Sequence, residues 1–289
     1  MIVFGGSSSV GLAWDVSKDI GAQLGKNEVK RFPDGEIYVK INSEVKNQDC
    51  AVIQSVRSSD NLVELFLFLD ALKDQGAREV AAVMPYMAYS RQDKVFTKGE
   101  ALSAKTILKL VDELSSRVVT VNTHFMRGHG DGVYHKIRFR NLDAIPSLIS
   151  YLKVRMSDPT VIAPDEGSLG MAKYAAELLG CDFDHIKKKR ISGEEVRIET
   201  KSLNVRNKDV LILDDIISTG NTIAKVADFV GEWRPKTISV ACIHALFTNG
   251  MDMFKGKIDR LIATNTVESS VSKVNVGPLI AKELREVLR

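Results

Sequence analysis

The stretch from residue 210 to residue 230 constrains the fold of this chain more than any other. Residues 210–213 are Val, Leu, Ile and Leu, an apolar run typical of a strand buried on both faces in a parallel sheet. Asp214 and Asp215 follow at its carboxyl end, then a short polar turn, and residues 223–230 continue with helical periodicity. Open α/β sheets bind their ligands at the carboxyl ends of strands. The stretch therefore predicts a ligand site.

The polar turn and the two carboxylates indicate what this ligand is. A glycine-containing turn that opens a helix directs backbone N–H groups and the positive end of the helix dipole at one point, which favours a phosphate. The carboxylates cannot serve a phosphate, but they suit sugar hydroxyls or a metal carried with the ligand. An acidic helix cap would explain one Asp and a Thr but not the second Asp. We predict a phosphorylated sugar, with its phosphate on Ser218, Thr219, Gly220, Asn221 and Thr222.

Length and composition bound the class of protein. A chain of 289 residues is long enough for two domains, each with its own core. Its net charge of +3 is too small to imply a nucleic-acid partner. The three cysteines form no CxxC pair and fit reduced thiols better than disulfides or a zinc site. With no secretory signal and no apolar run long enough to span a bilayer, we expect a cytoplasmic protein without a membrane partner.

Strand and helix patterns alternate along the chain, which predicts an α/β protein with mostly parallel sheets. The two halves look like one architecture used twice: two similar domains, each a mostly parallel sheet flanked by helices. We place the first at residues 1–142 and the second at 143–277, with a last helix at 278–289 that can pack back on the first half. Residues 128–140, rich in Gly, His and Arg, are interpreted as a connecting loop.

Four further segments carry polar groups in suggestive places. Pro33-Asp34-Gly35 predicts a β-turn of a hairpin. Residues 85–94 crowd two Tyr with Arg, Gln, Asp and Lys after a predicted strand, and Arg suits polyphosphate because its planar fork donates two aligned hydrogen bonds. His124 follows another strand, where a lone His is more often structural. The basic run at 187–190 is either a surface patch or a set of cations for a phosphoryl group.

The chain resembles the ribose-phosphate pyrophosphokinase family along essentially its whole length. The 210–222 stretch is similar to the phosphoribosyl-pyrophosphate-binding motif of the type I phosphoribosyltransferase fold. Other motifs stand in the family's order: Arg31-Phe32-x-Asp34-Gly35-Glu36, Pro85-Tyr86-x-x-Tyr89-x-Arg91-Gln92-Asp93, Asn122-x-His124, Pro164-Asp165-x-Gly167 and Lys188-x-Arg190.

This resemblance implies an activity and a set of roles. The expected reaction transfers the diphosphoryl group of ATP to the 1-hydroxyl of ribose 5-phosphate, giving AMP and phosphoribosyl pyrophosphate for nucleotide biosynthesis. A flexible catalytic loop at about 187–200 and a homodimer or larger homo-oligomer, such as a hexamer, are also implied. The residue roles are ATP binding by Phe32, Asp34, Glu36, Arg91 and Gln92; ribose 5-phosphate binding by Asp214, Asp215 and Ser218–Thr222; Mg²⁺ near His124 and Asp165; and catalysis by Lys188 and Arg190.

The chain departs from the family pattern at two positions. Asn122 stands where Asp is usual, and Arg127 stands where Gln is usual; a neutral amide is a weaker magnesium ligand than a carboxylate. Two alternatives remain at this point. A phosphoribosyltransferase would keep the 210–222 motif but leave the Arg91 and Phe32 segments without a purpose. A catalytically silent regulatory subunit of the same fold is disfavoured by the presence of both Lys188 and Arg190.

Overall fold

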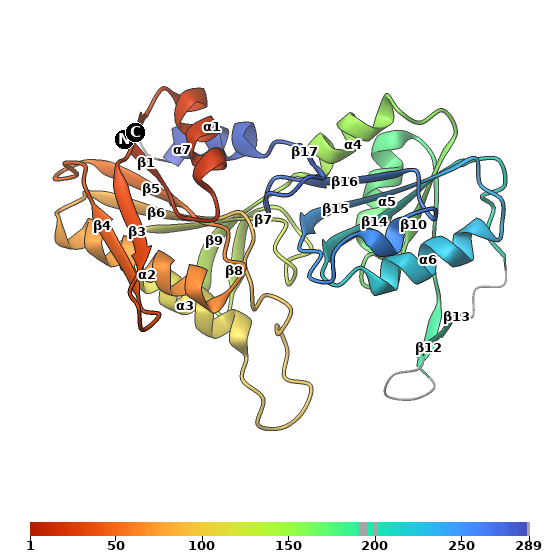
Figure 1. The fold of residues 1–289 in the computed structure, drawn as a ribbon, viewed down its shortest axis with the longest axis horizontal. Helices are drawn as coiled ribbons and strands as arrows, with labels where there is room; N and C mark the ends of the chain where they lie inside the picture. The colour runs from red at the N-terminus through yellow and green to blue at the C-terminus, as the bar shows by residue number, and fades with distance from the viewer. Residues whose placement is uncertain (191–195, 199–201, 288–289) are drawn as a thin grey trace. The chain divides into compact units, whose positions relative to one another are not determined.

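The computed structural model describes residues 1–190, 196–198 and 202–287, which form two compact units (Figure 1). Unit 1 contains Met1–Asp143 together with Thr266–Glu268 and the described residues from Asn275 onward. Unit 2 contains Ala144–Asn265 and Ser269–Val274. The C-terminal segment thus returns to the unit in which the chain began.

Unit 1 is built on a seven-stranded sheet in the order β2-β1-β5-β6-β7-β9-β8. All neighbouring strands are parallel except β8, which runs antiparallel to β9. Strands β5 and β6 lie in the middle and are almost entirely buried, as expected where helices cover both faces of a parallel sheet. The strands are β1 Ile2–Gly5, β2 Gln23–Leu24, β5 Asp49–Ile53, β6 Glu79–Met84, β7 Arg117–Val121, β8 Gly130–Tyr134 and β9 Ile137–Leu142.

Four helices and a separate hairpin complete unit 1. In Figure 1, α1 and α7 lie on one face of the sheet and α2 and α3 on the other. The hairpin of β3 and β4 is a two-stranded antiparallel sheet whose second strand packs against α2. The elements are α1 Val10–Ile20, α2 Ser59–Asp74, α3 Ser103–Leu114, α7 Gly277–Val287, β3 Asn27–Arg31 and β4 Ile37–Ile41.

The prediction of a connecting loop over residues 128–140 is wrong, because these residues form the β8–β9 hairpin at the sheet edge. Its turn residues, His135 and Lys136, have φ values of 49° and 71°. Two-residue hairpin turns of this kind usually contain Gly or Asn, so their usual signal is missing. Along β9, buried Ile137 and Phe139 alternate with Arg138 and Arg140, which is the pattern of a half-buried strand, but the Gly, His and Arg content of the segment indicated a loop instead.

Unit 2 contains a six-stranded, all-parallel sheet in the order β11-β10-β14-β15-β16-β17. In Figure 1, α4 and α6 lie on opposite faces of this sheet, and α5 packs against α4. Strands β12 and β13 pair only with each other. The elements are β10 Pro159–Ala163, β11 Asp182–His185, β12 Lys188–Arg190, β13 Val196–Ile198, β14 Asp209–Ile217, β15 Thr237–Ala245, β16 Arg260–Thr264, β17 Ser272–Val274, α4 Ile145–Lys153, α5 Leu169–Leu179, α6 Asn221–Gly231 and the 3₁₀ turn η1 Asp252–Phe254.

The α/β class with mostly parallel, helix-flanked sheets is therefore confirmed. The three cysteines are unpaired, and Cys50 and Cys242 are buried, as expected for reduced thiols. Within the described parts of the chain, no helix is both long and apolar enough to cross a membrane.

A buried carboxylate attaches α7 to the sheet of unit 1. Glu283, which is 5% exposed, accepts a hydrogen bond from Arg140 Nε at 2.9 Å and lies 3.4 Å from Arg117 Nη1. Arg140 lies on β9 and Arg117 on β7, so one side chain of α7 ties two strands together. Hydrogen bonds to charged groups contribute more than neutral ones, because both partners are otherwise left desolvated.

We expect Glu283→Gln to lower the free energy of unfolding by about 1.5–3 kcal/mol, the scale of a charged hydrogen bond. Urea unfolding followed by circular dichroism measures this change. Glu286→Gln on the exposed face of the same helix is the matched control and should stay within about 0.5 kcal/mol of the parent chain. Equal effects of the two substitutions would contradict a specific role for the buried carboxylate.

Candidate active site

Strand β14 extends further than the sequence predicts. Asp214 and Asp215 were expected to follow the strand, but they lie within it, because β15 continues to pair with it as far as Ile217 opposite Ala245. The two carboxylates are therefore held on a rigid ladder, and both side chains are half-buried. The turn that follows, from Ser218 to Gly220, leads directly into α6 at Asn221.

Gly220 is the residue that makes this turn possible. Its φ of 86° lies in the left-handed region, and it caps the N-terminus of α6. A Cβ at this position would lie 2.9 Å from Met253 Sδ and 3.1 Å from Phe254 Cζ, both near η1. The first-turn N–H groups of a helix have no partners within the helix, so they are available to an anion. In this structure the Asn221 N–H donates to Thr219 Oγ1 at 3.4 Å, and phosphate binding by this turn stays a prediction.

Negative charge is concentrated beside this turn. Burial, then the neighbouring charges of Asp215 and Asp165, raises the pKa of Asp214 well above its ordinary value. Asp165 follows β10, where its Oδ1 accepts hydrogen bonds from the Gly167 N–H at 3.0 Å and from Ser168 Oγ at 3.1 Å. A ligand that brings hydroxyl donors or a cation would relieve the repulsion among these three carboxylates.

These carboxylates fit a magnesium ion that arrives with its ligand. Among the residues that the structure describes, no group of three or more His, Cys, Asp or Glu side chains forms a ready-made metal site. Magnesium is usually held by only one or two carboxylates together with substrate phosphates and waters. Hard oxygen ligands are present at Asp165, Asp214 and Asp215, so the donor set suits such an ion.

In unit 1, the turn of the β3–β4 hairpin presents the predicted ATP-binding residues to solvent. Phe32, Asp34 and Glu36 are all exposed, and the Phe32 ring is 42% exposed with its edge against Tyr38 at a centroid distance of 5.7 Å. The turn is closed by the Phe32 N–H, which donates to the Glu36 carbonyl at 2.8 Å. An exposed aromatic ring on a well-formed turn is suited to stacking.

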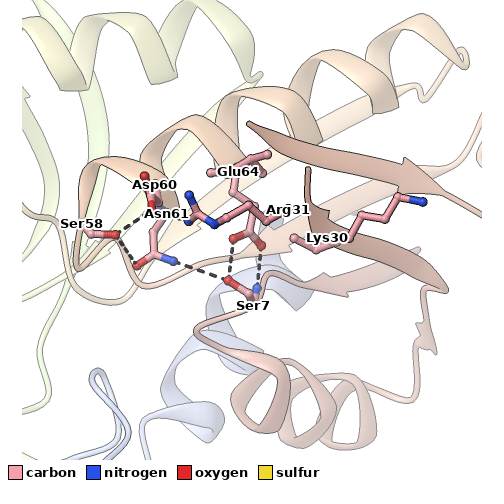
Figure 2. Close-up of a pocket in the computed structure, with 9 residues that line it drawn as sticks. Ser7, Lys30, Arg31, Ser58, Asp60, Asn61 and Glu64 are labelled. Carbon is pink, nitrogen blue, oxygen red and sulfur yellow. Dashed lines mark hydrogen bonds and ion pairs between the residues drawn. The ribbon is translucent and has the colours of Figure 1, made fainter. Parts of the chain in front are cut away.

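The part of the hairpin next to its turn lines a polar cavity of about 320 Å³ (Figure 2). Arg31 donates to the Gly35 carbonyl at 2.8 Å and forms an ion pair with Asp60, at the start of α2. Glu64, which is 3% exposed, accepts hydrogen bonds from Ser7 N and Oγ at 2.6 and 2.5 Å. The cavity is lined by Ser7, Val29, Lys30, Arg31, Ile37, Ser58, Asp60, Asn61 and Glu64.

The loop after β6 also reaches the start of α2. The Tyr89 hydroxyl lies 2.6 Å from Ser59 Oγ. Gln92 Nε2 donates to the Lys94 carbonyl at 3.0 Å and to Glu100 Oε2 at 3.2 Å, whereas Arg91 is exposed. The first turn of α2 therefore contacts both segments that carry predicted ATP-binding residues.

The loop after β7 carries His124 and Arg127, both exposed. At its start, Asn122 has a φ of 39°, and its Nδ2 donates to His129 Nε2 at 2.9 Å and to Asp143 Oδ1 at 3.2 Å. An amide can donate both hydrogen bonds, whereas a carboxylate can donate neither and could bond to His129 only by accepting an Nε2–H, which gives the departure from Asp at this position a physical reason. An Asp here would face Asp143 with a like charge.

Tyr134, which the sequence did not single out, joins this loop to the loop after β6. Its ring stacks on Phe125 at a centroid distance of 4.3 Å, and its hydroxyl donates to the Asp93 carbonyl at 2.8 Å. Burial raises the pKa of Tyr134, with a smaller contribution from Asp93. Sequence reasoning missed it because it lies in the hairpin that was interpreted as a loop.

The predicted catalytic residues Lys188 and Arg190 have a backbone in β12, which pairs with β13. Their side chains, and residues 191–195 and 199–201 of the predicted catalytic loop, lie outside the part of the chain that is described.

Comparison with known proteins covers both units. Residues 1–114 match the model of the N-terminal domain of ribose phosphate pyrophosphokinase, and residues 143–260 match the phosphoribosyl transferase domain. A ribose-phosphate pyrophosphokinase of Methanothermobacter thermautotrophicus is 36% identical over 99% of this chain and all of its own length. Ribose-phosphate pyrophosphokinase 2 of Archaeoglobus fulgidus is 38% identical over 96% of this chain and 97% of its own. The crystal structure of phosphoribosylpyrophosphate synthetase from Mycobacterium smegmatis superposes with a TM-score of 0.86 at 25% identity, covering 99% and 98% of the two chains.

The raised pKa of Asp214 predicts how pH acts on stability. The folded chain holds the Asp214 proton more tightly than the unfolded chain, so this group's contribution to stability is present below its ordinary pKa of 3.8 and is lost as pH rises toward the folded pKa. Asp214→Asn removes the titration. We expect the melting temperature of the variant to exceed that of the parent chain at neutral pH and the gap to narrow as pH falls toward about 4.

Differential scanning fluorimetry between pH 4 and pH 8 measures this gap. Glu232→Gln, at an exposed carboxylate after α6, is the control and should track the parent chain across the range. A gap for Asp214→Asn that is constant with pH would contradict the assignment.

Proposed function

The chain belongs to the ribose-phosphate pyrophosphokinase family, and we propose that it transfers the diphosphoryl group of ATP to the 1-hydroxyl of ribose 5-phosphate, giving AMP and phosphoribosyl pyrophosphate. The observation that carries this proposal is the combination of two matches in one chain. Residues 143–260 match a phosphoribosyl transferase domain, and residues 1–114 match the N-terminal domain of the pyrophosphokinases. A phosphoribosyltransferase that joins a base to phosphoribosyl pyrophosphate would leave the N-terminal match without a purpose.

Ribose 5-phosphate is proposed to bind in unit 2. Its phosphate would accept hydrogen bonds from the Ser218–Thr222 turn, because Gly220 lets the chain turn into α6 so that its N-terminus is available to an anion. Its hydroxyls would donate to Asp214 and Asp215, whose mutual repulsion such donors relieve. The protein thus offers carboxylate acceptors to the hydroxyls of the sugar and hydrogen-bond donors to its phosphate, which fixes the orientation of the ligand.

ATP is proposed to bind with residues of unit 1. Arg91 and Gln92 would contact its phosphates and Phe32 would stack on adenine, with Asp34 and Glu36 meeting polar groups of the nucleotide. We further propose that the exposed hairpin turn serves a neighbouring subunit, so that the active enzyme is a homodimer or a larger homo-oligomer in the cytoplasm. Sedimentation velocity at assay concentration tests this assembly, and a fully active monomer would rule it out.

The magnesium ion and the basic residues are proposed to stabilise the negative charge of the phosphates. His124 of unit 1 and Asp165 of unit 2 are each proposed to serve Mg²⁺, which would neutralise charge on the polyphosphate. Lys188 and Arg190 would stabilise the charge that develops on the transferred group as the sugar oxygen forms its new bond to phosphorus and AMP leaves. We assign no general base, since phosphoryl transfer depends mainly on positioning and electrostatics.

The test of the activity is direct. The purified chain incubated with ATP, Mg²⁺ and ribose 5-phosphate should produce AMP and phosphoribosyl pyrophosphate in equal amounts, followed by ³¹P NMR. Omitting ribose 5-phosphate is the control and should abolish AMP formation. Release of pyrophosphate from phosphoribosyl pyrophosphate and a purine or pyrimidine base, without AMP formation in the first assay, would indicate a phosphoribosyltransferase instead. Inactivity in both assays would indicate the silent regulatory subunit.

The proposed catalytic pair gives a second test. Lys188→Ala and Arg190→Ala should each lower kcat by about 10²- to 10⁵-fold, the range for single oxyanion donors and arginine fingers. Both Michaelis constants should change much less, because other residues hold the ground-state substrates. Lys187→Ala removes the adjacent cation of the same run and should keep kcat within about threefold. If the double variant Lys188→Ala/Arg190→Ala kept near-normal kcat, the run would be a surface patch.

A further inference from the structure

Asn141 is a fully buried residue in β9 whose side-chain amide bonds to the loop after β7 and to Thr120 on β7 itself. Its Oδ1 accepts from the Thr123 N–H at 3.0 Å and from Thr120 Oγ1 at 3.1 Å. Its Nδ2 donates to the Gly128 carbonyl at 2.9 Å. One side chain thus contacts the residue just before His124 and the far end of the same loop.

Other contacts also fix this loop to the sheet: the Phe125 ring lies 4.3 Å from that of Tyr134 on β8 and 5.8 Å from that of Phe139 on β9, between ring centroids. Thr123 is 4% exposed, and its Oγ1 has no hydrogen-bond partner among the described residues, so its anchoring depends on its main chain. A further attachment is Asn122, whose N–H donates to the Leu142 carbonyl at 2.9 Å and whose left-handed φ of 39° costs conformational energy. A strained strand end persists only where its surroundings hold it.

We propose that Asn141 is a positioning residue that sets the place of His124 by closing both ends of the loop between Asn122 and Gly128. An amide is required, because the position needs an acceptor for the Thr123 N–H and a donor for the Gly128 carbonyl in one planar group. Being fully buried, Asn141 cannot touch a nucleotide and acts only through the loop. The inference rests on the proposed function insofar as His124 serves Mg·ATP.

The informative variant is Asn141→Asp. It keeps the shape and the acceptor but replaces the donor to Gly128 by a second oxygen, so it releases the far end of the loop. Thr120→Val is the matched control, because it removes the other hydrogen bond to Asn141 Oδ1 from strand β7 and leaves the loop contacts in place. Where a buried carboxylate prevents folding, Asn141→Ser removes the same donor without a charge.

Two readouts are needed on the full-length enzyme. The first is the NMR spectrum of histidine-labelled protein, in which the His124 signal should move in Asn141→Asp but not in Thr120→Val, with His185 and His244 of unit 2 as internal references. The second is calorimetric binding of Mg²⁺ with α,β-methylene ATP. Affinity should fall about 10- to 100-fold in Asn141→Asp, as for residues that orient metal-site ligands. Ribose 5-phosphate affinity should stay within about twofold.

His124→Ala separates failure of the inference from failure of the proposed function. If His124→Ala weakens nucleotide binding while folded Asn141→Asp and Asn141→Ser leave both the His124 signal and the affinity unchanged, the positioning role is overturned. If the His124 signal moves in Asn141→Asp but neither Asn141→Asp nor His124→Ala changes nucleotide affinity, the loop does not serve ATP. That result overturns the assignment of His124 and the functional part of the inference with it. Equal losses in Thr120→Val and Asn141→Asp would reduce Asn141 to a structural residue.

Discussion

The parallel pairing of β14 with β15 is the constraint on which the unit 2 site depends. Because the ladder runs on to Ile217 opposite Ala245, the backbone at Asp214 is fixed by sheet hydrogen bonds and cannot move to separate the carboxylates. Their repulsion appears instead as the raised pKa of Asp214. The carboxylates are therefore already in place before a sugar hydroxyl or a cation binds. Binding does not have to order the backbone of the site, which favours affinity.

The predicted site residues of unit 1 are held in place in a different way. Its proposed ATP-binding residues stand on turns and loops beyond the strands, where no ladder holds them. Side chains do this work: Arg31 pairs with Asp60, Tyr134 links the loops after β6 and β7, and Asn141 closes the His124 loop. A single substitution can remove each of these side-chain contacts. We therefore expect substitutions away from the ligands to lower activity more often in unit 1 than in unit 2.

The sequence predicted most strands and helices because buried parallel strands are continuous apolar runs, and residues 210–213 are the clearest case. It failed at β8–β9, where the Gly, His and Arg content outweighed the alternation of buried Ile137 and Phe139 with arginines, and where the turn lacks glycine. The predicted end of β14 was also too early. Asp214 and Asp215 indicate a loop in the sequence alone, because the pairing with β15 is not visible there. Asn141 had no signal at all: a buried amide is recognised only by its partners, and these come from β7 and from the loop that β9 closes.

Asn122 shows why a family pattern cannot be transferred without its neighbours. Where the family has Asp, this chain has an amide whose Nδ2 donates to His129 Nε2 and to Asp143. A carboxylate would instead face the like charge of Asp143, and it could bond to His129 only by accepting an Nε2–H. The substitution is thus matched by local partners and need not mark a lost activity. It does remove one hard oxygen anion from the loop, which leaves His124 as the residue of this loop that we propose to serve Mg·ATP. An imidazole holds phosphate oxygens or metal-bound water well only when its orientation is fixed. In the proposal made above, the buried Asn141 amide contributes that fixation through its hydrogen bonds to the Thr123 N–H and the Gly128 carbonyl.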